Sequence, residues 1–258
     1  MAIVQSFEGA IQAASGQLGF NAHFALAAKA LGFAIFFDGL DGRIARMTNT
    51  TSDFGRELDS LADFITFAIA PGMLAFMWGV RYVAVAAESS LTSHLMKAGY
   101  LAAFFYLLCG GVRLARFNVQ TNPVPKNPGR PDRKSFVGMP SPAGAGLIAS
   151  IVFFDPVPVR SVAFSILWLV LVVSAGLLMV STWRYPSFKQ VSVSKPRTPL
   201  IALFVGVVAL CIWEWAQPFL LAAATTYALS GIAIRVGGLL RRYRRVRPSA
   251  SYPEHQVG

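Results

Sequence analysis

Long apolar stretches, separated by short polar segments that hold most of the charged residues, run along almost the whole chain. A helix needs roughly 20 apolar residues to cross the hydrocarbon core of a bilayer, so we interpret these stretches as membrane-spanning helices. They cover residues 22–46, 60–86, 95–115, 138–154, 161–182, 199–215 and 218–240. The pattern therefore predicts an all-α polytopic transmembrane helix bundle with about seven full spans.

The pattern is less regular in three places. Residues 2–18 are only mildly apolar and contain Gln and Glu side chains, so we expect a short N-terminal helix there rather than a full span. The second span contains a Pro-Gly pair at residues 71–72, where we expect a break. We expect a turn around residues 217–218 between the last two spans. The start of the chain has no basic segment followed by an apolar core, so we expect no cleavable signal peptide.

Composition indicates the same class of protein. The chain is 55% hydrophobic and 14% charged, with a mean hydropathy of +0.54, whereas a soluble domain carries about 25% charged residues. The formal net charge is +11. The basic residues lie in short loops between apolar stretches, where anionic lipid headgroups explain them better than nucleic acid does. We therefore expect an integral membrane protein in contact with membrane lipids, without a nucleic-acid partner.

The distribution of Lys and Arg predicts the orientation in the membrane. If the spans alternate, three loops and the C-terminal tail lie on one side, and all of them are basic. Their basic residues are Arg43, Arg46, Arg116, Lys126, Arg130, Arg133, Lys134, Arg184, Lys189, Lys195, Arg197, Arg241, Arg242, Arg244, Arg245 and Arg247. The opposite loops, near 88–94 and 155–160, are short and nearly neutral. The positive-inside rule places the basic side in the cytoplasm. We expect one domain over residues 1–240 in the cell inner membrane and a basic cytoplasmic tail over residues 241–258.

Four aspartates mark the polar stretch between the first two spans, which reads FDGLDGRIARMTNTTSDFGRELDSLADF over residues 37–64. Asp38 and Asp41 are three residues apart, and Asp59 and Asp63 are four apart, so each pair shares one face of a helix. A helical hairpin with its turn at TNTTS brings the carboxylates together at membrane depth, near the cytoplasmic side. The alternative is that the aspartates cap helices and pair with neighbouring arginines. A cluster of this kind at a membrane boundary favours a functional site.

Clustered carboxylates repel one another and are costly at low dielectric, so the arrangement requires cations. All-oxygen ligands select hard ions, which predicts Mg²⁺, Mn²⁺ or Ca²⁺ rather than zinc. A pair of such ions holds a diphosphate and leaves one carboxylate free to act as a base. Gly42 and Gly55 lie within the cluster, where a missing side chain lets a ligand or the facing helix approach closely.

The spacing of this stretch resembles the signature of the CDP-alcohol phosphotransferases, D-x2-D-G-x2-A-R-x8-G-x3-D-x3-D, with no substitution. The matching residues are Asp38, Asp41, Gly42, Ala45, Arg46, Gly55, Asp59 and Asp63. The resemblance implies that the aspartates bind two divalent cations over the diphosphate of a CDP-alcohol, and that Asp63 is the general base. It also implies that Gly42, Ala45 and Gly55 make room for the cytidine half, while Arg46 is either structural or faces a phosphate.

Three further stretches are similar to the membrane-embedded phosphatidylserine synthases of bacteria and archaea. They read RLARFNV at 113–119, FVGMPSP at 136–142 and MVSTWRYPSFK at 179–189. The resemblance covers most of residues 34–190. It implies transfer of the phosphatidyl group of CDP-diacylglycerol to the hydroxyl of L-serine, which gives phosphatidylserine and CMP. It also implies a homodimer.

Arg113, Arg116 and Asn118 are the candidate residues for binding the acceptor. In the functional interpretation, the two arginines supply positive charge for a lipid phosphate or for the serine carboxylate, and Asn118 holds a polar substrate group. In the alternative, the arginines end a helix and only follow the positive-inside rule. Ser141, which lies between two prolines, is either a substrate contact or a packing residue.

The N-terminus departs from the family that the chain resembles. Members of that family open with a full first span that begins near a Pro-Asn pair, and residues 2–18 match only the end of such a span. We therefore expect either a start further upstream or a shortened first helix.

Two other functions stay open. One is a sibling enzyme that uses glycerol 3-phosphate or inositol phosphate as the acceptor. The other is a transporter or lipid-binding membrane protein whose acidic cluster binds cations.

Overall fold

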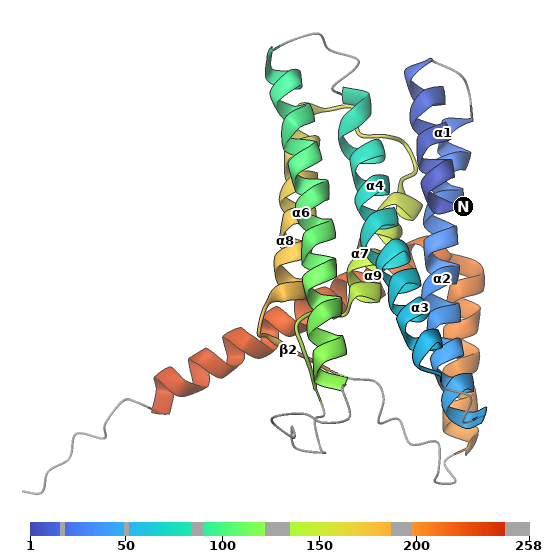
Figure 1. The fold of residues 1–258 in the computed structure, drawn as a ribbon, viewed down its shortest axis with the longest axis vertical. Coiled ribbons are helices and arrows are strands. Elements are labelled where there is room, and N and C mark those ends of the chain that lie inside the picture. The colour runs from blue at the N-terminus through green and yellow to red at the C-terminus, as the bar shows by residue number, and fades with distance from the viewer. Residues whose placement is uncertain (16–18, 49–51, 84–89, 122–134, 187–197, 246–258) are drawn as a thin grey trace, which may run out of the picture.

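The computed structural model describes residues 1–15, 19–48, 52–83, 90–121, 135–186 and 198–245. In chain order, the elements are α1 (Ala2–Ala14), α2 (Phe20–Thr48), α3 (Asp53–Phe64), η1 (Ile65–Ile69), α4 (Ala70–Phe76), η2 (Met77–Arg81), α6 (Ser90–Thr121), β1 (Ser135–Val137), α7 (Ser141–Phe154), α8 (Val162–Val180), β2 (Arg184–Pro186) and α9 (Thr198–Arg245). The segments η1 and η2 are π-helical. Figure 1 shows α1, α2, α4, α6 and α8 running roughly parallel, with the C-terminal half of α9 oblique to them.

Long apolar helices confirm the predicted class of protein. Within the described residues, the helices able to cross a membrane are Asn21–Leu40, Glu57–Arg81, Ser90–Val119, Val162–Val180 and Glu214–Gly237. The helix α7 is apolar but shorter. The chain is thus a helical integral membrane protein with five such helices in the part that the structure describes. The count of about seven spans stays a prediction, because the side chains of residues 198–213 lie outside the described part.

The second predicted span is one continuous helix, so the break expected at residues 71–72 is wrong. The helix instead passes through a π-helical segment, η1, immediately before Pro71. Proline has no N–H and leaves the carbonyl four residues earlier without its helical donor. That carbonyl belongs to Phe67, and it accepts a hydrogen bond from the hydroxyl of Tyr106 on α6 at 3.3 Å. The buried tyrosine supplies the missing donor and allows the helix to continue.

Side chains of α8 satisfy further carbonyls around the second π-helical segment. Trp168 Nε1 donates to the carbonyl of Ala75 at 2.9 Å, and Ser165 Oγ donates to that of Gly79 at 2.7 Å. A Cβ at Gly79 would overlap the indole ring of Trp168. Glycine at this position therefore allows α8 to approach closely enough to donate these hydrogen bonds.

The last two predicted spans correspond to two helical segments that share the label α9 and meet at a kink. Trp215 has non-helical backbone angles, φ −132° and ψ 48°, at this kink. The kink lies three residues before Pro218, whose ring and missing N–H disfavour a regular preceding turn. The break expected between these two spans is therefore confirmed, and it lies at Trp215 rather than at residues 217–218.

A short antiparallel strand pair joins two loops that the all-α prediction treated as irregular. Strands β1 and β2 pair with Phe136 opposite Tyr185. Directly after β1, Gly138 has φ +82°, a conformation that favours glycine. The N–H of Gly138 donates to the carbonyl of Trp183 at 2.8 Å, and a Cβ there would overlap the carbonyl of Met179. The pair thereby holds the start of α7 against the end of α8.

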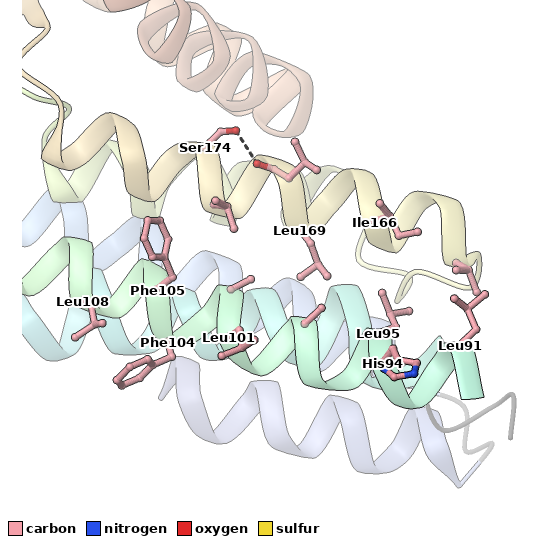
Figure 2. A pocket seen from close by; sticks show the side chains of 15 residues that line it. Leu91, His94, Leu95, Leu101, Phe104, Phe105, Leu108, Ile166, Leu169 and Ser174 are labelled. Carbon is pink, nitrogen blue, oxygen red and sulfur yellow. Dashed lines mark hydrogen bonds between the residues drawn. The ribbon is translucent and has the colours of Figure 1, made fainter. Parts of the chain in front are cut away.

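An apolar groove with a volume of about 800 Å³ lies between α6 and α8 (Figure 2). Leu101, Phe104 and Ile166 are among its lining residues, and His94 lies at one end. None of the motif aspartates lines it. Apolar surface of this kind is what lipid acyl chains cover in a bilayer, so the groove belongs to the exterior of the protein and not to the predicted active site.

Candidate active site

The end of α2 and the start of α3 form the predicted helical hairpin. Helix α2 ends at Thr48, and Ser52 is the N-cap of α3. Ser52 Oγ accepts a hydrogen bond from the N–H of Gly55 at 3.0 Å, which satisfies a free donor at the helix start. A Cβ at Gly55 would lie 3.0 Å from Ser52 Oγ. One role of this motif glycine is therefore to leave room for the cap.

Three of the motif aspartates meet at this hairpin. Carboxylate oxygens of Asp38, from α2, and of Asp59 and Asp63, from α3, lie within 4.8 Å of one another. Asp59 is exposed, and the other two are half-buried. Asp41 lies one turn beyond Asp38 in α2, but its side chain is outside the described residues.

The predicted nucleotide-site residues other than Gly55 belong to the last turns of α2. They are Gly42, Ala45 and Arg46. Their side chains also lie outside the described part of the chain. The structure therefore places their backbone beside the acidic cluster and leaves their contacts with a nucleotide as predictions.

Two glycines in α6 let this helix approach the one that carries Asp63. A Cβ at Gly110 would lie 2.7 Å from the Cβ of Ala68, and Gly111 also faces the same helix closely. Larger side chains at these positions would hold the two helices apart. The close approach places Arg113, one turn further along α6, within electrostatic range of Asp63.

Arg113 is held in place from α7. Its Nη1 donates to Ser141 Oγ at 2.7 Å, and Ser141 is the buried first residue of α7. The Nε of Arg113 is buried and has no hydrogen-bond partner among the residues that the structure describes. A buried donor without a partner is costly, so this part of the site is suited to an anionic ligand group.

The other two candidate acceptor residues lie in different surroundings. Arg116 Nη1 donates to the carbonyl of Val180 at the C-terminal end of α8, at 3.5 Å, where the helix dipole favours a cation. Asn118 Nδ2 donates to Ser60 Oγ at 3.1 Å, which links the end of α6 to α3. The structure thus places Arg113 against the acidic cluster, whereas Arg116 contacts α8.

Ser141 is the residue that the structure places directly against Arg113. Ser141 belongs to the FVGMPSP stretch, and its position at a helix start after proline is a sequence signal for a special role. Tyr227, from the C-terminal half of α9, packs against Tyr185 of β2, with the ring centroids 5.7 Å apart. No local motif around Tyr227 indicates this contact, because it depends on how α9 packs against β2.

The donor set fits a hard divalent cation. Carboxylates this close repel one another unless a cation neutralises them. Carboxylate oxygens are the ligands that Mg²⁺, Mn²⁺ and Ca²⁺ prefer. Asp38, Asp59 and Asp63 meet this requirement in the structure, and Asp41 follows in the same helix as Asp38.

Together, the long apolar helices and the acidic hairpin define a polytopic membrane protein with a carboxylate-rich site at one end of its bundle. The family model described as CDP-alcohol phosphatidyltransferase matches residues 3–232. The chain belongs to the CDP-alcohol phosphatidyltransferase family.

Curated relatives share this family. A CDP-diacylglycerol–serine O-phosphatidyltransferase of Helicobacter pylori is 37% identical over 180 residues, which cover 68% of this chain and 66% of the relative. The enzyme of that name in Methanocaldococcus jannaschii is 31% identical over 206 residues, 80% of this chain and 82% of the relative. The aligned stretch thus spans slightly less than two thirds of the Helicobacter protein. The predicted family resemblance is confirmed, and with it the class of enzyme at the level of the family.

Proposed function

We propose that this protein transfers the phosphatidyl group of CDP-diacylglycerol to the hydroxyl of L-serine, which gives phosphatidylserine and CMP. The observation that carries the proposal is the meeting of Asp38, Asp59 and Asp63 beside Arg113 at one end of the bundle. The relatives named as serine phosphatidyltransferases support serine as the acceptor.

The motif aspartates are the proposed ligands of two divalent cations, Mg²⁺ or Mn²⁺ or Ca²⁺. When bound, such ions neutralise the charge of the diphosphate and of the CMP leaving group. Asp63 is the proposed general base, which takes the proton of the serine hydroxyl as the oxygen attacks the lipid-side phosphorus. Asp63 also interacts with Arg113, so the base adjoins the proposed acceptor-binding cation. Gly42, Ala45, Arg46 and Gly55 are the proposed nucleotide-binding residues.

Arg113 is the proposed ligand of an anionic substrate group, either the serine carboxylate or the lipid phosphate. Its planar guanidinium donates in a fork that matches both groups. Ser141 occupies Nη1, and the buried Nε has no partner among the described side chains and backbone groups. Arg116 and Asn118, at the end of the same helix, are proposed as weaker substrate contacts.

We infer an orientation with the site facing the cytoplasm, in the cell inner membrane. In Figure 1, the α2–α3 hairpin, the end of α6 and strand β2 lie at one end of the bundle, and the end of α1 and the start of α6 lie at the other. In the sequence, most of the Lys and Arg residues directly follow the elements that end there, and the positive-inside rule supports the cytoplasmic placement of this end. We further propose one membrane domain over residues 1–240, a basic tail over 241–258, and a homodimer.

CMP release by the purified protein tests this function directly. The protein in lipid nanodiscs is supplied with CDP-diacylglycerol and Mg²⁺, with and without serine, and the lipid product is identified by chromatography. We expect CMP release to require serine, to yield phosphatidylserine and to stop in excess EDTA. Incorporation of glycerol 3-phosphate but not serine would make the acceptor assignment wrong. Absence of CMP release with every acceptor would favour a cation-binding membrane protein without this activity.

A further inference from the structure

A second pocket lies toward the end of the bundle opposite the acidic cluster. It has a volume of about 450 Å³ and is lined by residues of η2, of α7, of α8 and of the connection between α7 and α8. In Figure 1, that connection lies toward the same end as the start of α6. The N–H of Val159 in the connection donates to the carbonyl of Trp78 at 3.1 Å, which holds the connection against η2. Asp38, Asp59 and Asp63 do not line this pocket, so it is separate from the proposed active site.

One lining side chain has an indole N–H without a partner. Trp78 is only 6% exposed, and its Nε1 is buried with no hydrogen-bond partner among the residues that the structure describes. The neighbouring indole differs, because Trp168 Nε1 donates to the carbonyl of Ala75. The two rings pack edge to face, with centroids 4.8 Å apart. A buried N–H without an acceptor is costly, so an acceptor oxygen from a ligand in the pocket would stabilise this arrangement.

Two charged side chains also line the pocket. Asp155 is engaged within the connection, since its Oδ1 accepts from the N–H of Val157 at 3.1 Å. Arg160 is exposed, and no carboxylate in the described part of the chain forms an ion pair with it. Arg160 is therefore the charged group that a ligand can use, and its planar donor fork suits a phosphate.

An apolar strip continues from this charged end into the membrane. Phe164, Leu167 and Leu171 line the pocket from one face of α8, because they are three and four residues apart. They extend roughly 10 Å along the helix. The candidate span of α8 begins at Val162, so Arg160 lies at the boundary where lipid headgroups lie. The apolar strip follows at the depth of the acyl chains.

We propose that this pocket binds a glycerophospholipid. Its phosphate lies on Arg160, an ester carbonyl accepts from the indole N–H of Trp78, and one acyl chain lies along the strip of Phe164, Leu167 and Leu171. A free anion would use the arginine but leave the strip uncovered, whereas a phospholipid matches the charged, polar and apolar parts in their order along the pocket. Because the two sites lie at opposite ends of the bundle, this lipid is distinct from the substrate and product of the proposed reaction.

Photo-crosslinking in detergent tests the site. The purified protein is incubated with a phosphatidylglycerol that carries a diazirine in one acyl chain, and the labelled residues are mapped by mass spectrometry. We expect labelling of residues 164–171 that unlabelled dioleoylphosphatidylglycerol prevents, whereas neither dioleoylglycerol, which lacks the phosphate, nor inorganic phosphate does so. Competition by inorganic phosphate would overturn the lipid assignment in favour of a free anion. Equal competition by dioleoylglycerol would overturn the role of the phosphate.

Two variants test the polar contacts. Arg160→Gln should weaken the labelling of residues 164–171 by roughly tenfold, because it removes the charged partner of the phosphate. Trp78→Phe keeps a ring against Trp168 but removes the N–H, and we expect a loss of roughly fivefold. Lys97→Gln and Trp215→Phe are the matched controls. They change an exposed cation of α6 and an exposed tryptophan of α9 that do not line the pocket, so labelling should stay at the wild-type level.

Labelling in the groove between α6 and α8 provides an internal control, because the α6 side of that groove, at Leu101 and Phe104, should be labelled equally in every variant. Unchanged labelling of residues 164–171 in folded Arg160→Gln and Trp78→Phe proteins would show nonspecific lipid contact and overturn the inference. If Trp78→Phe does not fold, Arg160→Gln decides the outcome, since an exposed side chain contributes little to folding. The readout does not involve CMP release, so failure of the proposed function leaves this test intact.

Discussion

At Asp63, the acidic cluster interacts electrostatically with the guanidinium of Arg113. A carboxylate in this position can take the proton of an alcohol while the neighbouring carboxylates hold cations. The proposed division of roles therefore depends on one side chain, and conservative substitutions can test it without disturbing the fold.

Asp63→Asn should lower the rate of phosphatidyl transfer by roughly 10²–10⁴-fold, because an amide cannot act as the base. The amide is nearly isosteric, so the thermal stability of the protein should change little. Initial rates of CMP release provide the measurement. Asp155→Asn serves as the control, because Asp155 lies at the far end of α7 and only caps the N–H of Val157. Near-normal turnover in a folded Asp63→Asn protein would rule out the base assignment.

Arg113→Lys and Arg116→Lys should differ, although the two arginines are three residues apart on one helix. Lysine keeps the charge at position 113 but loses the planar fork and its contact with Ser141, so we expect the KM for serine to rise about tenfold or more. At position 116, a lysine can still reach the carbonyl of Val180, and we expect kinetics near wild type. The measurement is initial rate against serine concentration. Equal effects from both substitutions would show that Arg113 has no special role.

At the scale of elements, the site depends on helices that approach one another more closely than ordinary side chains allow. Gly110 on α6 faces Ala68, and the hydroxyl of Tyr106 on the same helix replaces the donor that Pro71 removes. These contacts hold α6 against the helix that carries Asp59 and Asp63. The geometry between base and arginine thus follows from helix packing.

Gly110→Ala should separate these two helices, because the new Cβ would lie 2.7 Å from that of Ala68. Overpacking of this kind costs roughly 1–3 kcal/mol. We therefore expect a lower Tm and a larger fall in kcat/KM than the stability loss alone explains. Gly32→Ala is the control, since nothing lies within 4 Å of a Cβ at that position of α2. If Gly110→Ala keeps wild-type activity, the close approach does not position the site.

At the scale of the whole molecule, the orientation in the membrane decides which substrates reach the site. The two ends of α8 offer a matched pair of exposed positions, Ser161 before the helix and Thr182 after it. With Cys109 and Cys211 replaced by alanine, Ser161→Cys should react with an impermeant thiol reagent added to intact cells. Thr182→Cys should react only after the membrane is permeabilised. Labelling of Thr182→Cys in intact cells would reverse the proposed orientation.

The sequence by itself determined the class of protein, the position of most helices and the chemistry of the site. The length of an apolar stretch is visible in the local sequence, and the thickness of the bilayer sets the length that a spanning helix needs. The stretches around α2, α6 and α8 therefore predicted helices that the structure confirms. The aspartate spacing is also local, because residues three or four apart share a helix face in any helical fold. The hairpin that joins Asp38 to Asp59 and Asp63 follows from these two facts.

Only the tertiary structure decided what surrounds Arg113. Ser141 and Asp63 come from two different helices, and their meeting at Arg113 depends on long-range contacts that leave no local pattern. The same reason explains the corrections to the helices. Whether Pro71 breaks a helix depends on a hydroxyl from α6, and the exact position of the break between the two helices of α9 lies at Trp215 rather than at the following proline. Hydropathy records which residues prefer the membrane, whereas packing between helices determines which of them meet.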